Sequence, residues 1–171
     1  MIEQLATRAA QAIHGIDPQR TASVAVLRYG FIVFFEGALI AMLTAAIGWA
    51  TGKPGETLLT LVLFVAIRQM SGGFHFRSSM LCIVFSTALL SLLPHIPLPE
   101  RAPLYMTLCG IVCFAAFAPS GIKGRTRIAE NNYKWLKIIS IIFISINLLM
   151  QSEMFAKVII TQALLIVKYR R

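Results

Sequence analysis

The sequence predicts an all-α integral membrane protein with several membrane-embedded helices. Of its 171 residues, 57% are hydrophobic and only 13% are charged, whereas soluble domains carry about 25% charged residues. So few charges leave too little polar surface to face water, and lipid must contact much of the protein. Apolar segments recur along the chain, separated by polar or Gly- and Pro-containing turns. Neither a linker nor a repeat divides them, which predicts a single membrane domain over residues 1–171.

Residues 1–20 are expected to form a short interfacial helix. Ile2, Leu5, Ala9 and Ile13 fall roughly on one face of such a helix, as amphipathic helices at a membrane surface require. Gly15 is expected to end it, and an irregular polar lead-in is the alternative. We expect no signal peptide here, because this segment has acidic residues and no long apolar core.

Six apolar segments follow the N-terminal segment. The first, 27–50, is interrupted only by Arg28 and Glu36 and reaches the roughly 20 residues that cross a bilayer. Several others hold only 13–15 uninterrupted apolar residues, so they borrow flanking residues, span a thinned bilayer or pack inside the protein as partial spans. Six crossings are expected, with four as the alternative. The remaining segments are 57–70, 80–93, 104–118, 136–150 and 155–167.

The basic residues predict the orientation in the membrane. Thirteen of the 16 Lys and Arg residues fall in segments 1–28, 68–77, 118–137 and 168–171, and Lys53, Arg101 and Lys157 fall in the opposite loops. An excess of Lys and Arg marks the cytoplasmic side of membrane proteins. Both termini and the 68–77 loop are therefore predicted to be cytoplasmic. The net charge of +9 is spread between apolar runs rather than gathered in one patch, so we expect no nucleic-acid partner.

The 68–77 loop and the residues after it contain the candidate chemistry. Gly72 and Gly73 are expected to end the second apolar helix, because glycine allows the backbone to turn sharply. Ser78 or Ser79 is placed to cap the next helix. Cys82 would then lie in or near the first turn of that helix, where the positive end of the helix dipole is felt.

His75 lies between these two helices and is the candidate activator of Cys82. The thiolate is the reactive form of cysteine, and a helix N-terminus or a neighbouring imidazole promotes it. In one unbroken helix the two residues would lie about 10.5 Å apart along the axis. A catalytic pair therefore requires non-helical chain around His75, in a cavity open to the cytoplasm. A buried and inert Cys82 is the alternative.

The pattern Arg-x-x-x-Gly-Gly-x-His, then six residues, then Cys, begins at Arg68 and follows an apolar helix. It resembles the accessory gene regulator B (AgrB) family of membrane-embedded cysteine endopeptidases, which process the precursor of a bacterial quorum-sensing peptide. The stretch Phe117-Ala118-Pro119, which runs into a basic loop, is also similar. The family usually has a denser basic cluster there, which 129–132 interrupts in this chain.

The resemblance implies that Cys82 is the nucleophile and His75 the general base, in a bacterial cell membrane and with no cofactor. Cys82 would attack a peptide carbonyl, and the N-terminal part of the precursor would remain as a thioester. An internal Cys or Ser of the precursor would then close a thiolactone or lactone ring. Backbone N–H groups near Gly72, Gly73 or Cys82 are candidates for stabilising the oxyanion. Ser78 would support the site as a helix cap.

Charged residues near the motif are candidates for supporting roles. Glu36 lies inside the first apolar segment, where a carboxylate is costly enough to suggest function. It orients His75, pairs with Arg28 two turns earlier, or pairs with Arg68. Arg68 either holds an acidic part of the substrate or only signals membrane orientation. A precursor with an acidic segment is the predicted partner, and its candidate binding residues are Arg77, Lys123, Arg125 and Arg127.

Two other classes of protein fit the apolar segments. One is a small membrane transporter, and the other is a peptide-binding membrane subunit without catalysis. The transporter is weakened because no inverted repeat with matching broken helices is evident. Cys109 and Cys113 are interpreted as packing residues, and the absence of further ligands around them argues against a metal site. The small body and short helices favour a homodimer.

Overall fold

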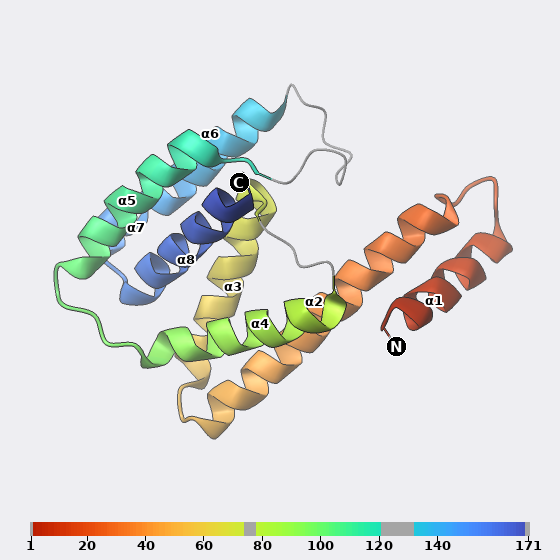
Figure 1. The fold of residues 1–171 in the computed structure, drawn as a ribbon, viewed down its shortest axis with the longest axis horizontal. Coiled ribbons are helices and arrows are strands. Elements are labelled where there is room, and N and C mark those ends of the chain that lie inside the picture. Colours follow the sequence, from red (N-terminus) through yellow and green to blue (C-terminus); the bar gives the residue numbers. More distant parts are fainter. Residues whose placement is uncertain (1, 74–77, 121–131, 170–171) are drawn as a thin grey trace.

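The computed structural model describes residues 2–73, 78–120 and 132–169, and its regular elements over these ranges are helices. An isolated parallel bridge joins Gly72 to Ser120. The predicted all-α fold is therefore confirmed. In chain order the elements are α1 (Ile2–Ile16), α2 (Val24–Ala50), α3 (Pro54–Ser71), α4 (Ser79–Leu92), η1 (Leu93–His95), α5 (Ala102–Phe117), α6 (Tyr133–Ser145), α7 (Asn147–Met150) and α8 (Glu153–Tyr169) (Figure 1).

The N-terminal segment is a helix, as the apolar face predicted, and the irregular alternative is wrong. Helix α1 continues to Ile16, one residue past the glycine that was expected to end it. It packs along α2, with Ala6 and Ala10 fully buried between them. An exposed ion pair of 3.1 Å between Glu3 and Arg28 joins the two helices. Figure 1 shows α1 lying beside α2, away from the other helices.

Helix α8 is packed among the helices of one part of the fold. It packs against α5 and α3. Helix α6 also packs against α5 and α3. The approach of α5 to α8 requires glycine at position 110, because a Cβ there would lie 2.1 Å from Cγ2 of Ile159. Helices α2 and α4 pack against each other on the other side of α3 (Figure 1). The core between these helices includes Phe64, Ile67, Leu90, Phe114, Ile144, Ile159 and Ile166.

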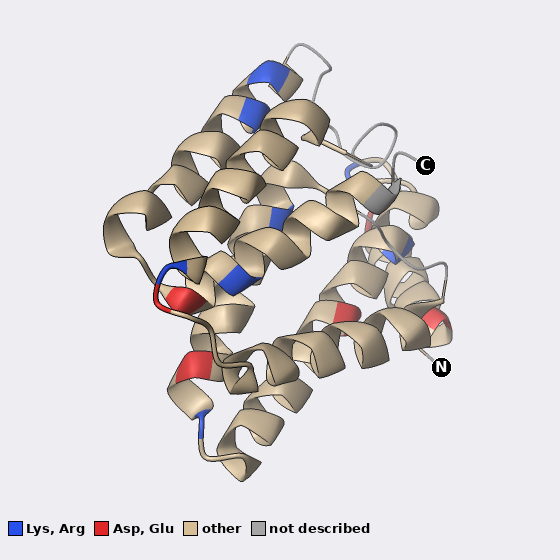
Figure 2. Ribbon diagram, turned by 60° about the vertical axis from the view of Figure 1, so that its left-hand side comes forward, with Lys and Arg blue, Asp and Glu red and all other residues tan. Residues whose placement is uncertain are grey.

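Within the described residues, two helical stretches are long and apolar enough to cross a membrane. They are Val24–Ala50 and Tyr133–Met150, with mean hydropathies of 2.1 and 1.6. Large apolar side chains on α2 are exposed, including Phe34 at 65% and Trp49 at 76%, as expected for contact with lipid. Figure 2 shows that most helical turns carry no charged residue. Shorter apolar helices cover Ser79–His95 and Ala102–Phe117.

Three segments predicted to share the cytoplasmic side meet at one end of the bundle. The Ser120 N–H, just after α5, donates to the Ser71 carbonyl at the end of α3 at 2.9 Å. The Ser120 hydroxyl reaches the Ile166 carbonyl in the last turns of α8 at 3.4 Å. Lys157 differs from its prediction as an outer-loop residue. It lies in α8, is only 3% exposed and pairs with Glu153 at 3.4 Å.

Candidate active site

Cys82 occupies the position near a helix N-terminus that the sequence predicted. Ser78 is the N-cap of α4, with φ −98° and ψ 124°, although its side chain makes no capping hydrogen bond. The Cys82 N–H donates to the Ser78 carbonyl at 3.0 Å, so Cys82 closes the first turn. Its side chain is 6% exposed. The nucleophile candidate is therefore buried at the start of α4.

The His–Cys motif is not contained in one continuous helix. Helix α3 ends at Ser71 and α4 begins at Ser79, so no single helix contains both members of the motif. His75 itself lies outside the described residues. The four basic residues predicted to bind substrate, Arg77, Lys123, Arg125 and Arg127, also lie outside them.

Three helices supply charged or polar groups around the Cys82 thiol. Arg68 of α3 and Glu36 of α2 act on it electrostatically with opposite signs, and the thiol forms a side-chain hydrogen bond with Ser86. The guanidinium of Arg68 also lies over the ring of Phe64, 5.4 Å from its centroid, at cation–π distance. A small pocket adjoins the thiol and is lined by Phe64, Arg68, Cys82, Phe85, Ser86, Leu89 and Leu165.

The predicted pairing of Glu36 with Arg28 is wrong. The guanidinium of Arg28 is bound to Glu3 of α1 at 3.1 Å, so Arg28 does not serve Glu36. Glu36 instead interacts electrostatically with Cys82, which lines the pocket. Glu36 is half-buried on α2, which packs against α4.

The backbone N–H groups suggested for an oxyanion hole are already engaged. The Gly72 N–H donates to the Arg68 carbonyl at 2.9 Å, and the Gly73 N–H donates to the Ser120 carbonyl at 2.8 Å. The Cys82 N–H is bound to Ser78. These three groups are bonded within the chain, and an oxyanion site near them stays a prediction. The two glycines instead shape the backbone, since their φ angles of 69° and 130° are unfavourable for other residues.

The sequence model of the family described as AgrB, accessory gene regulator B, matches residues 4–168. The chain belongs to this family. It is 27% identical over 97 residues to a putative AgrB-like protein of Halalkalibacterium halodurans, a match that covers 57% of this chain and 49% of the relative. The chain thus spans about half the length of that curated relative. No solved structure matches the chain. The resemblance seen in the His–Cys motif is confirmed as family membership.

The structure adds to this AgrB-family site one residue that the motif did not indicate. Gln162 of α8 is fully buried, and its Nε2 donates to the Ser71 hydroxyl at 3.2 Å and to the Gly72 carbonyl at 2.5 Å. The Ser71 hydroxyl in turn donates to the Ile67 carbonyl at 2.9 Å. An amide inside an apolar segment is costly unless it is bonded. A glutamine within the apolar segment was therefore the one signal in the sequence that could have indicated Gln162.

The other two cysteines lie on α5 and line no part of the Cys82 pocket. Cys113 is half-buried and packs against the core, as predicted. Cys109, one turn earlier, is exposed, so its interpretation as a packing residue is wrong. The two thiols interact with each other.

Proposed function

We propose that this AgrB-family chain is a membrane-embedded cysteine endopeptidase that cleaves a short precursor peptide at the cytoplasmic face. The observation that carries the proposal is the position of Cys82 in the first turn of α4, where Arg68 and Glu36 both act on its thiol. The broken connection from α3 supports it, because the motif places His75 in that connection. A cysteine that served only for packing would need none of these charged neighbours.

The reaction begins with transfer of the Cys82 proton to the imidazole of His75. The thiolate attacks a peptide carbonyl of the precursor, and the resulting oxyanion collapses as the C–N bond breaks. The departing amine takes the proton from His75, so the C-terminal part of the precursor leaves with a neutral amine. The N-terminal part remains bound to Cys82 as a thioester.

Ring closure then releases the product. A Cys or Ser side chain within the bound part of the precursor loses its proton to His75 and attacks the thioester carbonyl. The new thiolactone or lactone bond forms as the Cys82 sulfur leaves and recovers a proton. The apolar walls contributed by Phe64, Phe85 and Leu165 support this outcome, because exclusion of water favours cyclisation over hydrolysis.

Glu36 is assigned a supporting role in this reaction. A carboxylate that receives a proton-bearing imidazole nitrogen fixes the orientation and tautomer of a catalytic histidine. Glu36 is suited to this role, since it is half-buried and acts electrostatically on the same thiol that His75 would deprotonate. We propose that Glu36 orients His75, while Arg68 offsets its negative charge at the thiol.

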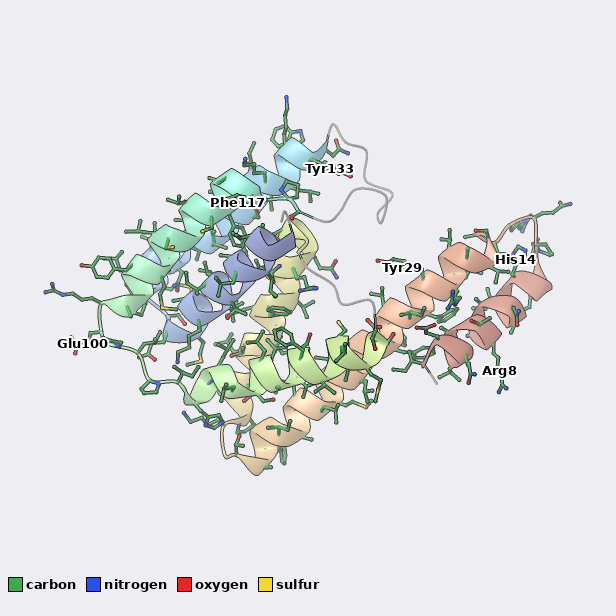
Figure 3. The ribbon with its side chains drawn as sticks, viewed as in Figure 1. Arg8, His14, Tyr29, Glu100, Phe117 and Tyr133 are labelled. Carbon is green, nitrogen blue, oxygen red and sulfur yellow. The ribbon has the colours of Figure 1, made fainter. Side chains whose placement is uncertain are left out.

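The membrane arrangement proposed here has six membrane-embedded segments with both termini in the cytoplasm. The meeting of the ends of α3, α5 and α8 supports it, because the positive-inside pattern assigns those ends to one side. Figure 3 places Phe117 and Tyr133 at the neighbouring ends of α5 and α6, on either side of the basic loop. Its residues Lys123, Arg125 and Arg127, with Arg77, are proposed to attract an acidic segment of the precursor.

The proposal is tested by co-expressing the chain with the short peptide encoded beside its gene and analysing both by mass spectrometry. We expect a cleaved or cyclised peptide and an acyl adduct on Cys82 that hydroxylamine removes. Cys82→Ala should abolish both, whereas Cys109→Ala, which removes an exposed thiol outside the pocket, should abolish neither. An intact peptide bound to unmodified wild-type chain would refute catalysis and favour a binding or transport protein.

A further inference from the structure

We propose that Gln162 is a positioning residue that holds the starts of two loops, at Gly72 and Ser120, in a fixed relation to the Cys82 pocket. The inference rests on the proposed peptidase function. Ser71, Gly72, Gly73, Ser120 and Gln162 make up the structure concerned, which we call the polar junction.

The polar junction joins the starts of two loops that are far apart in the sequence. The Ser120 N–H donates to the Ser71 carbonyl at 2.9 Å, and the Gly73 N–H donates to the Ser120 carbonyl at 2.8 Å. These two bonds form the parallel bridge between Gly72 and Ser120. The residues that follow Gly73 contain His75, and those that follow Ser120 contain the basic loop. Any displacement of one loop start is therefore passed to the other.

Gln162 fixes this pair of loop starts to α8. Its amide orientation is unambiguous, because the Gly72 carbonyl can only accept a hydrogen bond and must face Nε2. The same Nε2 reaches the Ser71 hydroxyl, which has already donated its proton to Ile67. One helical turn further on, the Ile166 carbonyl accepts the Ser120 hydroxyl at 3.4 Å. Both sides of the bridge are thus anchored to one face of α8.

The carbonyl oxygen of the Gln162 amide indicates that stability alone does not explain why a glutamine occupies this position. Its Oε1 is buried and has no hydrogen-bond partner within the described part of the chain. An unpaired buried acceptor is unfavourable, and methionine, of similar length, would fill the space without one. The contribution of the amide must come from the two acceptors that Nε2 holds in place.

The polar junction is linked to the Cys82 pocket through one close approach and one hydrogen bond. A Cβ added at Gly73 would lie 3.9 Å from Cβ of Leu165, so the Gly73 backbone lies near Leu165, which lines the pocket beside Cys82. The Gly72 N–H is bonded to the backbone of Arg68, whose side chain acts on the thiol. Loss of the Gln162 bonds is therefore expected to misplace reacting groups without removing any of them.

The test compares Gln162→Met with Thr161→Val, which replaces a buried polar side chain on the neighbouring position of α8. Single-turnover acylation of Cys82 by the co-encoded peptide is measured over peptide concentration, with thermal unfolding in the same detergent. Gln162→Met should lower the rate at saturation at least tenfold, with the half-saturating concentration within about twofold of wild type and unfolding unchanged. Thr161→Val should match wild type throughout.

An unchanged rate in folded Gln162→Met would overturn the inference. If Gln162→Met does not fold, Ser71→Ala provides the decision, since it removes one of the two acceptors of Nε2. It should lower the saturating rate less strongly, again without changing half-saturation, and a wild-type rate would refute the role. Wild-type chain that is never acylated would instead overturn the proposed function and this inference with it.

Discussion

Replacement of Gly73 by alanine tests the link between the loop backbone and the site. Gly73 has a φ of 130°, outside the left-handed helical region, and a side chain there costs about 1–3 kcal/mol. Its new Cβ would lie 3.1 Å from Nε2 of Gln162, so the amide must move. Weakening the bond from Nε2 to the Gly72 carbonyl costs about 1 kcal/mol more. We expect a total destabilisation of about 2–4 kcal/mol.

Gly52→Ala is the matched control. Gly52 also has a positive φ, 73°, but a Cβ there would meet nothing within 4 Å. Its cost is therefore limited to the left-handed backbone, about 1–2 kcal/mol. Gly52 precedes α3 and Gly73 follows it, so about 27 Å of helix separates the two sites. Only Gly73→Ala should slow acylation of Cys82, and we expect at least a tenfold loss.

Both variants are measured by reversible unfolding in mixed micelles, followed by far-UV circular dichroism, and by single-turnover acylation. The excess destabilisation of about 1–2 kcal/mol in Gly73→Ala corresponds to roughly a 5- to 30-fold change in the ratio of folded to unfolded protein. Equal unfolding of the two variants would show that the contact with Gln162 carries no energy. A normal acylation rate in folded Gly73→Ala would show that the site does not depend on this backbone.

Three further changes test the packing around the site. Gly110→Ala should destabilise the protein by about 1–3 kcal/mol through overpacking. Because Cγ2 of Ile159 is the clashing atom, the double variant with Ile159→Ala should unfold with a smaller loss of stability than the sum of the two single variants. Asn147→Leu should cost about 1–3 kcal/mol in the same assay, since it leaves the buried Thr107 hydroxyl without the donor it has at 2.8 Å. Cys109→Ser should leave precursor cleavage at the wild-type rate, since this exposed thiol lies outside the pocket.

The sequence predicted the helices well because their apolar runs are separated by strong local signals. Helix α3 begins at Pro54, three residues before its predicted start, since proline is favoured in the first turn of a helix. The segment predicted as 136–150 is broken after Ser145 into α6 and α7. Asn147 at the break donates to Thr107 and accepts the Ser152 N–H. Such bonds between distant segments leave no periodic pattern in the chain.

Local signals also predicted part of the site, whereas the bonds between distant segments were not predicted. The adjacent glycines and serines marked a helix break, and Ser78 is the observed N-cap of the helix that contains Cys82. The bond from the Gly73 N–H to Ser120 could not be predicted, because Ser120 lies on another segment. Gln162 was missed because it lies 91 residues from its partner Ser71. Its only local signal was a polar side chain in an apolar run.

These observations make α8 the scaffold of the site, although the His–Cys motif lies in the first half of the chain. The end of α3 and the residue after α5 are both bonded to one face of α8, through Gln162 and the Ile166 carbonyl. Leu165 on the same stretch forms a wall of the Cys82 pocket. The close approach of Gly110 to Ile159 holds α8 against α5. A side chain that pushed these two helices apart would therefore displace the pocket wall and both loop starts together. In the proposed reaction the motif supplies the reacting groups, and α8 is expected to position them.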